Sequence, residues 1–143
     1  DMAYIDEKGQ EVRPIVIHRS SIGAYERTMA LLIERYAGAF PTWLSPNQVK
    51  IIPVSEKFND YGIKVKEIFE KNNIRAELDD SNESLGKRIR NAEKEKTPYI
   101  LVVGEKEKSE DTVSVRKRGV GDLGAKKAGE FVKEILEEIK NRE

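Results

Sequence analysis

The sequence contains no cysteine, a single histidine and a single tryptophan in 143 residues. Without cysteine the chain can form no disulfide, and the Cys-rich zinc sites of small metal-binding domains are excluded as well. It also lacks net charge, because 26 Lys and Arg residues balance 26 Asp and Glu residues. The composition therefore favours neither disorder driven by net charge nor a globally basic nucleic-acid-binding protein, and any RNA-binding surface must be local.

The sequence has no apolar run long enough to cross a membrane, and no signal-peptide pattern opens it. We therefore expect a cytoplasmic protein without a membrane partner. A chain of 143 residues has room for one ordinary domain and an appendage. Its first residues lead directly into an expected strand, which indicates the C-terminal piece of a longer protein.

The N-terminal third predicts two strands, a helix and a linker. The strands lie near Ala3–Ile5 and at Ile15–His18, joined by the polar turn Asp6–Gln10. Apolar periodicity predicts a helix from about Gly23 to Tyr36. Two prolines interrupt the pattern between Ala37 and Asn47, so we expect a linker there.

The remaining sequence predicts alternating strands and helices. The segment Tyr99–Val103 is nearly all apolar, as expected for a strand covered on both faces. This order predicts an α/β domain with a mixed β-sheet flanked by helices. The expected strands are 49–54, 74–78, 99–103 and 112–118, and the expected helices are 59–71, 85–96 and about 125–142.

A distinctive motif runs from Arg13 to Arg27 and reads RPIVIHRSSIGAYER. Arg27 falls in the first turns of the expected helix, where a cation opposes the helix dipole and needs an anionic partner. Glu26 could supply that partner. The whole motif, however, resembles motif 3 of class II aminoacyl-tRNA synthetases, in which a helical arginine packs against ATP. The resemblance implies that Arg27 contacts ATP, although Ala24 stands where a serine is common in the family.

His18 ends the expected strand of this motif. A lone histidine at a strand end is usually a packed or hydrogen-bonded residue. The motif resembles specifically the threonyl-tRNA synthetases, and this implies that His18 is one of three zinc ligands. There zinc binds the amino and hydroxyl groups of threonine, which lets the site reject valine. The other two family ligands are a cysteine and a second histidine, and this chain has neither. Zinc and ATP with Mg are therefore expected in the full-length enzyme, and no cofactor in this chain alone.

Basic residues concentrate in Lys87–Arg90 and Arg116–Arg118. Such charge runs are usually only solvated surface. Two features favour RNA here: the short helix carries cations beside a polar loop containing Asn82, and Glu107 lies near a predicted hairpin whose return strand points Arg116 outward. Glutamate accepts and arginine donates hydrogen bonds, so together they suit a splayed guanine.

The same region resembles the anticodon-binding domain shared by several class II synthetases, in its segments from Asn82 to Arg90, from Pro98 to Gly104 and from Val113 to Arg116. Threonine anticodons all end in G-U, so a guanine reader fits them. The resemblance implies anticodon contacts from Asn82, Glu107 and Arg116. We assign phosphate contacts to Lys87, Arg88 and Arg90.

The segment Gly119–Gly124 matches the G-x-G-x-x-G pattern of dinucleotide-binding sites and follows an expected strand. That fingerprint also needs a second parallel strand after the helix, with an acidic residue for the ribose. The sequence contains no such strand. We therefore expect turn glycines leading into the last helix, with Asp122 near its start.

The resemblance covers essentially the whole chain. It implies that residues 1–46 are the end of a class II catalytic domain and a linker, and that residues 47–143 are an anticodon-binding domain. The full-length enzyme would join threonine to its tRNA and form a homodimer, whereas this chain would bind the anticodon arm of threonine tRNA, not DNA, and catalyse nothing. The alternatives are a prolyl, glycyl or histidyl synthetase, a non-catalytic synthetase-like RNA-binding paralogue, and an α/β domain whose charges only solvate it.

Overall fold

The computed structural model describes residues 2–20 and 23–142, and the chain consists of two compact units, Asp1–Leu31 and Leu32–Glu143. The first unit contains an antiparallel hairpin of β1 (Tyr4–Ile5) and β2 (Glu11–Val12). Its turn is closed by Asp6, whose Oδ1 accepts hydrogen bonds from the backbone N–H groups of Lys8 and Gln10 at 2.8 and 2.9 Å. The first predicted strand and the polar turn are thus confirmed.

The predicted buried strand at Ile15–His18 is wrong. This segment has no regular secondary structure, and the side chains of Ile15 and Ile17 are 92 % and 86 % exposed. Apolar β-branched residues favour extended backbone, but a strand also needs a neighbouring strand to accept its hydrogen bonds. Among the described residues none pairs with this segment, because the hairpin closes earlier, at Glu11–Val12. Ser21 and Ile22 of the same motif lie outside the described residues.

Helix α1 (Tyr25–Tyr36) confirms the predicted helix, beginning two residues later than expected. None of its residues is buried, and Met29 and Ile33, which the sequence places on its apolar side, are 55 % and 49 % exposed. Within the described part of the chain, no helix is both long and apolar enough to cross a membrane.

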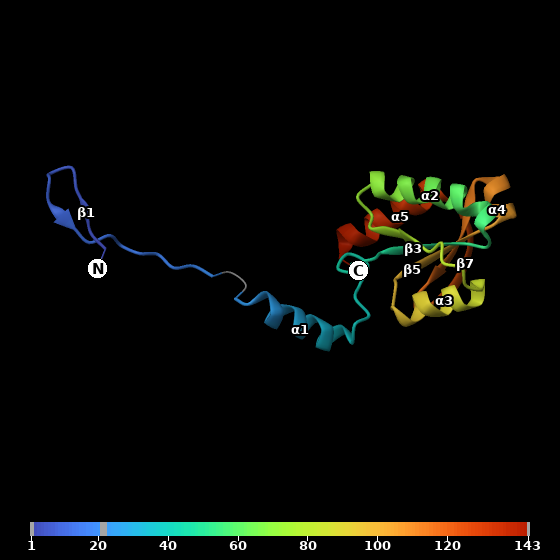
Figure 1. Cartoon of the computed structure of the whole chain (residues 1–143), viewed down its shortest axis with the longest axis horizontal. Coiled ribbons are helices and arrows are strands. Elements are labelled where there is room, and N and C mark those ends of the chain that lie inside the picture. Colours follow the sequence, from blue (N-terminus) through green and yellow to red (C-terminus); the bar gives the residue numbers. More distant parts are fainter. Residues whose placement is uncertain (1, 21–22, 143) are drawn as a thin grey trace. The chain divides into compact units, whose positions relative to one another are not determined.

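The second unit is built on a five-stranded sheet in the order β4-β3-β5-β6-β7. Strand β3 pairs in parallel with β4 and β5, and the remaining pairs are antiparallel. Helices α2 and α5 cover one face and α3 the other (Figure 1). The predicted mixed sheet flanked by helices is confirmed. The strands are Val49–Pro53 (β3), Ala76–Leu78 (β4), Tyr99–Val103 (β5), Thr112–Lys117 (β6) and Gly121–Lys127 (β7); the helices are Asn59–Lys71 (α2), Leu85–Lys94 (α3), Glu105–Glu110 (α4) and Ala128–Asn141 (α5).

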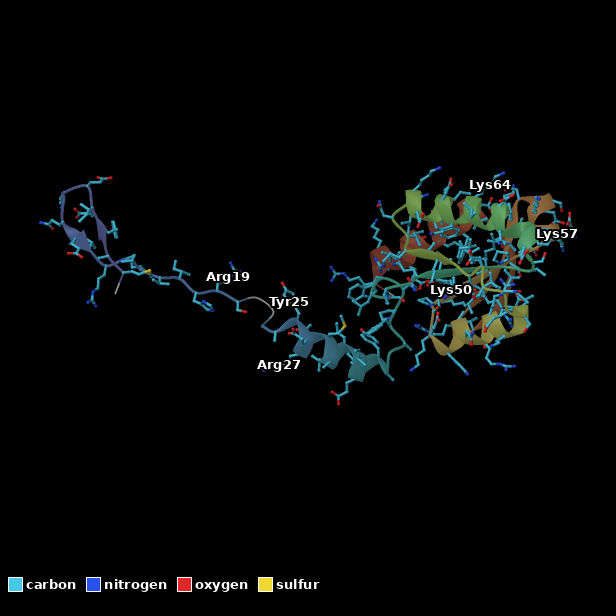
Figure 2. The ribbon with its side chains drawn as sticks, in the orientation of Figure 1. Arg19, Tyr25, Arg27, Lys50, Lys57 and Lys64 are labelled. Carbon is cyan, nitrogen blue, oxygen red and sulfur yellow. The ribbon has the colours of Figure 1, made fainter. Side chains whose placement is uncertain are left out.

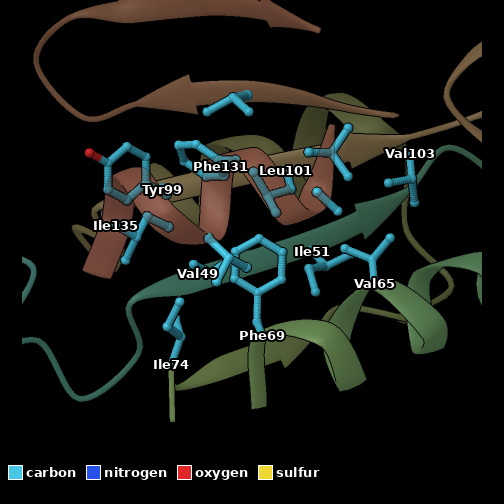
Figure 3. Close-up of a cluster of buried hydrophobic side chains, with 14 of the residues drawn as sticks. Val49, Ile51, Val65, Phe69, Ile74, Tyr99, Leu101, Val103, Phe131 and Ile135 are labelled. Carbon is cyan, nitrogen blue, oxygen red and sulfur yellow. The ribbon is translucent and has the colours of Figure 1, made fainter. Parts of the chain in front are cut away.

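The main core lies between the sheet and the pair α2 and α5 (Figure 3). Phe131 of α5 meets Phe69 of α2 and Tyr99 of β5 edge to face, with ring centroids 6.2 and 5.1 Å apart. The opposite face has a much smaller core of Ile52, Ala92 and Ile100 under α3. Because α3 covers only part of that face, the sheet beyond it stays open.

Two elements of the second unit were not predicted. The glycine-rich segment 119–124 lies in a β6–β7 hairpin, and β7 continues to Lys127, so the last helix begins at Ala128 rather than near residue 125. Asp122 therefore belongs to β7, where its Oδ1 accepts the N–H of Gly124 at 2.7 Å. Apolar periodicity does not indicate strand β7, because its side chains are mostly exposed and it pairs through its backbone. Helix α4, also exposed, was missed for the same reason.

Two helical glycines give a matched test of the packing. A Cβ on Gly62 of α2 would lie 2.8 Å from Leu78 Cδ1 and 3.1 Å from Pro53 Cγ, whereas a Cβ on Gly129 of α5 would meet nothing within 4 Å. We expect Gly62→Ala to lower the free energy of unfolding by about 1–3 kcal/mol, because it overpacks the contact between α2 and the sheet. Gly129→Ala should leave it unchanged or raise it by up to about 1 kcal/mol. Urea unfolding of both variants checks this, and equal effects would contradict it.

Candidate nucleic-acid interface

Asn82 and Glu107 both lie at the edge of the sheet where the parallel strands end. Asn82 is exposed in the loop after β4 and lines a cleft of about 180 Å³ together with Val54, which directly follows β3. Val54 also lies against Gly104, where a Cβ would come within 3.1 Å of Val54 Cγ2 and 3.2 Å of Glu107 Oε2. The carboxylate of Glu107 is therefore held beside Val54. In open α/β sheets this edge is the usual place for ligand binding.

Glu107 lies in the connection of the antiparallel pair β5 and β6, as the sequence suggested, but this connection is a short helix rather than a tight turn. Helix α4 connects β5 to β6, and Glu107 lies in its first turn. Its Oε2 accepts the backbone N–H of Gly104 at 3.0 Å, in the arrangement of a capping box. This hydrogen bond orients the half-buried carboxylate, so the other oxygen can accept from a ligand.

Arg116 lies in a separate cleft, on the face of the sheet that carries α3. It is paired with Ile100 of β5, and because opposite residues in a sheet point to the same face, its side chain shares the open side with Ile100. The half-exposed Arg116 lines a cleft of about 450 Å³, whose other walls include Glu93 at the end of α3 and the β6–β7 turn at Gly119. The prediction that Arg116 points away from the main core is confirmed.

Helix α3 connects the two clefts. It begins at Leu85, just after the loop of Asn82, and its penultimate residue Glu93 lines the cleft of Arg116. Lys87 and Arg90 are exposed on this helix, and Lys87 forms an ion pair with Glu83 at 2.6 Å. Edge cleft, helix and face cleft thus adjoin along one side of the domain, as a splayed single strand of RNA requires.

Arg88, the third cation assigned to phosphate, is 5 % exposed. Its guanidinium donates to the carbonyl oxygens of Pro53 at 2.7 Å and of Asp79 at 3.0 Å. These bonds tie α3 to the ends of β3 and β4. In this conformation Arg88 has a structural role, and of the three cations assigned to phosphate only Lys87 and Arg90 are exposed.

The other basic cluster is also partly used inside the fold. Lys117 donates to Glu138 of α5 at 2.9 Å, and Glu138 also accepts from the hydroxyls of Tyr99 and Thr42. Burial alone would raise the pKa of Glu138, but the hydrogen bonds from Thr42, Tyr99 and Lys117 outweigh it, so the pKa lies below its ordinary value. Burial and the bond to Glu138 raise the pKa of Tyr99 to about 12. Arg116 and Arg118 of this cluster line the same cleft, and Arg118 donates to backbone carbonyls rather than to Glu138.

His18 and Arg27 belong to the first compact unit. His18 is exposed in the irregular segment, and Arg27 is exposed on α1, where Figure 2 labels it. Within residues 2–20 and 23–142, no three His, Cys, Asp or Glu side chains are grouped so that they could hold a metal ion. The residues present therefore do not form a zinc site by themselves. The roles of His18 and Arg27 stay predictions.

The family is decided by a match to known sequences. A family model described as an anticodon binding domain matches residues 48–138, which include β3 to α5 and both clefts. The chain belongs to this family. The match leaves out residues 32–47, although the compact unit begins at Leu32, so the predicted boundary between residues 46 and 47 stays a prediction.

Relatives of this anticodon-binding domain are threonine–tRNA ligases. The chain is 54 % identical to that of Clostridium botulinum (strain Eklund 17B / Type B) over 143 residues, which is 100 % of this chain and 22 % of the relative. It is 49 % identical to that of Carboxydothermus hydrogenoformans over 142 residues, again 22 % of the relative. The chain thus spans about a fifth of the length of these relatives.

A solved structure is also similar to the anticodon-binding domain described above. It is the RNA binding domain of threonyl-tRNA synthetase from Cryptosporidium parvum Iowa II, with a TM-score of 0.76 and 28 % identity. The match covers 94 % of this chain and 34 % of that chain. The mixed sheet with α2 and α5 on one face and α3 on the other is therefore a known architecture of RNA-binding domains of this class.

The Glu138 cluster predicts a pH-dependent stability of the anticodon-binding domain. Because the pKa of Glu138 is lower in the fold than its ordinary 4.5, its contribution is present above that value and is lost as the pH falls through the folded pKa. We expect Glu138→Gln to lower the free energy of unfolding by about 1–3 kcal/mol at neutral pH and by much less at about pH 3.

Urea unfolding at both pH values measures this difference. Glu70→Gln is the control, because Glu70 pairs with Lys66 on the surface of α2 and its side chain is 51 % exposed. A Glu138→Gln effect that stays constant between the two pH values would contradict the assigned charge.

Proposed function

We propose that this chain is the C-terminal part of a threonine–tRNA ligase and that its anticodon-binding domain recognises the anticodon of threonine tRNA. The observation that carries the proposal is the 54 % identity to a threonine–tRNA ligase along the whole chain. This likeness favours threonine over the prolyl, glycyl and histidyl enzymes that share the domain plan. Asn82 and Arg116 line clefts that α3 connects, and Glu107 is held at the backbone of Gly104, at the same sheet edge as Asn82, which supports a role in binding RNA.

Base reading follows from the hydrogen-bonding groups at these positions. The Watson–Crick edge of guanine carries two neighbouring N–H donors, which suit the carboxylate of Glu107, and its other edge carries the acceptors O6 and N7, which suit the guanidinium of Arg116. Adenine presents a donor where guanine presents O6. Glu107 and Arg116 therefore supply groups that distinguish the central guanine of a threonine anticodon from adenine.

The catalytic contribution belongs to the full-length enzyme. There Arg27 would pair with ATP through a guanidinium that can bind phosphate and stack on a purine, with Mg neutralising the phosphates. His18 would be one zinc ligand, and the other ligands would have to come from residues outside this chain. The full-length ligase would be a cytoplasmic homodimer, and this chain alone would catalyse no ligation. His18→Ala should leave RNA binding by this chain unchanged, since His18 lies in the other compact unit.

Anticodon stem-loops test the recognition of guanine. At fixed salt, we expect this chain to bind the threonine stem-loop about 5–100-fold more tightly than the same loop with adenine in place of the central guanine, as one good bidentate contact allows. Arg116→Ala should remove most of this ratio. Fluorescence anisotropy of labelled loops measures both affinities. Equal binding of the two loops would overturn the anticodon assignment, and no binding would overturn RNA binding altogether.

Glu107→Gln provides a variant that keeps the fold. Glutamine can still accept the N–H of Gly104 in the capping box, so stability should change little. Its amide replaces an acceptor oxygen by a donor, so the preference for guanine should fall while the affinity for the adenine loop holds or rises. A loss of affinity for both loops alike would show that Glu107 contacts no base.

The salt dependence of RNA binding distinguishes phosphate contacts from base contacts. We expect Arg90→Ala and Lys87→Ala each to weaken the binding of the guanine and adenine stem-loops equally. Each substitution should reduce the slope of log K against log salt by roughly 0.7–0.9. The Arg90 substitution should have the larger effect, because Lys87 must break its ion pair with Glu83 before it can contact a phosphate. Titrations at several salt concentrations measure the slope. A change in the guanine-to-adenine ratio would contradict the assignment of either residue to phosphate.

A further inference from the structure

The segment between α1 and β3, which the sequence predicts to be a linker, is fixed to the domain by buried side chains and hydrogen bonds. We call residues 37–48 the strap. Thr42, Ser45 and Gln48 are buried, at 3 %, 5 % and 1 % exposure, and none of these side chains is apolar. Gln48 Nε2 donates to the carbonyl of Thr42 at 2.8 Å, and Thr42 in turn donates to Glu138. The strap is therefore held mainly by polar contacts.

One end of the strap is held by Arg75, which precedes β4. Its Nε and Nη2 donate to the carbonyl of Ser45 at 3.0 and 2.7 Å, its Nε to that of Pro46 at 3.1 Å, and its Nη2 to that of Trp43 at 3.1 Å. The ring of Trp43 also lies under the guanidinium of Arg142, 6.0 Å from ring centroid to Cζ. A single guanidinium thus binds the backbone carbonyls of Trp43, Ser45 and Pro46 with its fixed fork of donors, which the ammonium group of a lysine does not supply.

The other end of the strap is held by Arg118, which follows β6. Its Nη2 donates to the carbonyls of Phe40 at 2.6 Å and Ala39 at 3.2 Å, and its Nη1 donates to the carbonyl of Lys96. All three partners are neutral. Glu138, whose charge acts on Arg118, already accepts hydrogen bonds from Lys117, Tyr99 and Thr42.

Arg118 also forms part of the cleft of Arg116. It lines that cleft of about 450 Å³ and, with Lys117, a second hollow of about 190 Å³ against Pro41 and Thr42 of the strap. Thr97 likewise lines the cleft of Arg116 and a third hollow against the strap at Gly38 and Phe40. One wall therefore separates the predicted RNA-binding cleft from the strap.

We propose that docking of the strap and binding of RNA in the cleft of Arg116 stabilise each other, with Arg118 as the positioning residue that both share. The occupant of the cleft is an anionic single strand of RNA, so this inference rests on the proposed function. Arg118 acts by placing its charge at the cleft wall while its hydrogen bonds hold the strap.

The physical reason is the unneutralised charge of Arg118. Burial lowers the pKa of its guanidinium, and Glu138 opposes this only from a distance. Carbonyl oxygens satisfy its N–H donors but do not cancel its charge, so an RNA phosphate in the cleft would stabilise the guanidinium where it lies. Since Arg118 occupies that position by binding the strap, the anion favours the docked strap. By linkage, the docked strap must favour the anion equally.

Hydrogen exchange of the whole chain tests the proposal. The strap amide of Gln48 donates to the carbonyl of Arg75 at 2.9 Å and reports docking, while the amides of Leu44 and Ser45 bond to the carbonyl of Pro41 and report the local order of the strap. With the threonine stem-loop bound, we expect these amides to exchange about fivefold or more slowly than in the free chain, the lower end of common coupling strengths. Fluorescence of Trp43, the only tryptophan of the sequence, should change in parallel.

Two conservative variants separate coupling from direct contact. Arg118→Lys keeps the charge but loses the fork of donors, so the strap should exchange faster in the free chain and RNA should no longer slow it. Arg75→Lys loosens the strap from a residue that lines neither of the clefts above, so a fall of about fivefold or more in RNA affinity can arise only through the strap. Circular dichroism confirms that each variant is folded at the temperature used.

Lys64→Ala is the control, because Lys64 is an exposed cation on α2, on the opposite face of the sheet (Figure 2). It should change neither the strap exchange nor RNA affinity by more than about twofold. The coupling is wrong if the stem-loop binds without slowing exchange of the strap amides, or if the Arg75→Lys variant binds RNA as tightly as wild type. Anticodon binding would remain valid in either case. If wild type binds no stem-loop, the proposed function fails and the coupling fails with it.

Discussion

The register between β5 and β6 is the constraint on which the other features of the domain depend. Leu101 faces Val115 and Ile100 faces Arg116, so the pleat sends Val115 into the main core and Arg116 to the opposite face. Val115 is completely buried. A slip of one residue would bury the guanidinium and expose the valine, which makes the register strongly specified. The apolar packing of one face thus places the cleft residue on the other.

The uneven covering of the sheet makes room for a binding surface. Helices α2 and α5 bury one face with aromatic and branched side chains, whereas α3 buries only a small cluster around Ile52 and Ile100. A short helix over a half-covered face leaves open a cleft at Arg116 and presents Lys87 and Arg90 beside it. Stability and recognition are therefore assigned to opposite sides of the same sheet.

Six cations near the strap and the clefts divide into two groups by their surroundings. Arg75, Arg88 and Arg118 donate to backbone carbonyls and join segments distant in sequence, whereas Lys87, Arg90 and Arg116 line or flank the clefts. Backbone carbonyls satisfy the donors without neutralising the charge, so a structural arginine still contributes to the local field.

Local pattern was sufficient for the regular elements that bury apolar side chains. The apolar periodicity of 59–71 and the unbroken apolar run of 99–103 predict α2 and β5 with their exact bounds, because each element buries enough side chains to leave a signal. The motifs around Asn82, Glu107 and Arg116 likewise indicate the anticodon-binding family, which the family match confirms.

Sequence alone failed where burial gives no pattern: β7 pairs through its backbone, α4 is exposed, and Ile15–His18 has strand-forming residues but no partner in the described chain. It also failed to separate Arg88 and Arg118 from their neighbours, since carbonyl acceptors can be supplied by any residue. Sequence by itself thus determined which elements form and which family they belong to. Only the tertiary structure decided which cations are free to meet RNA, because that depends on which backbone carbonyls the fold brings within reach.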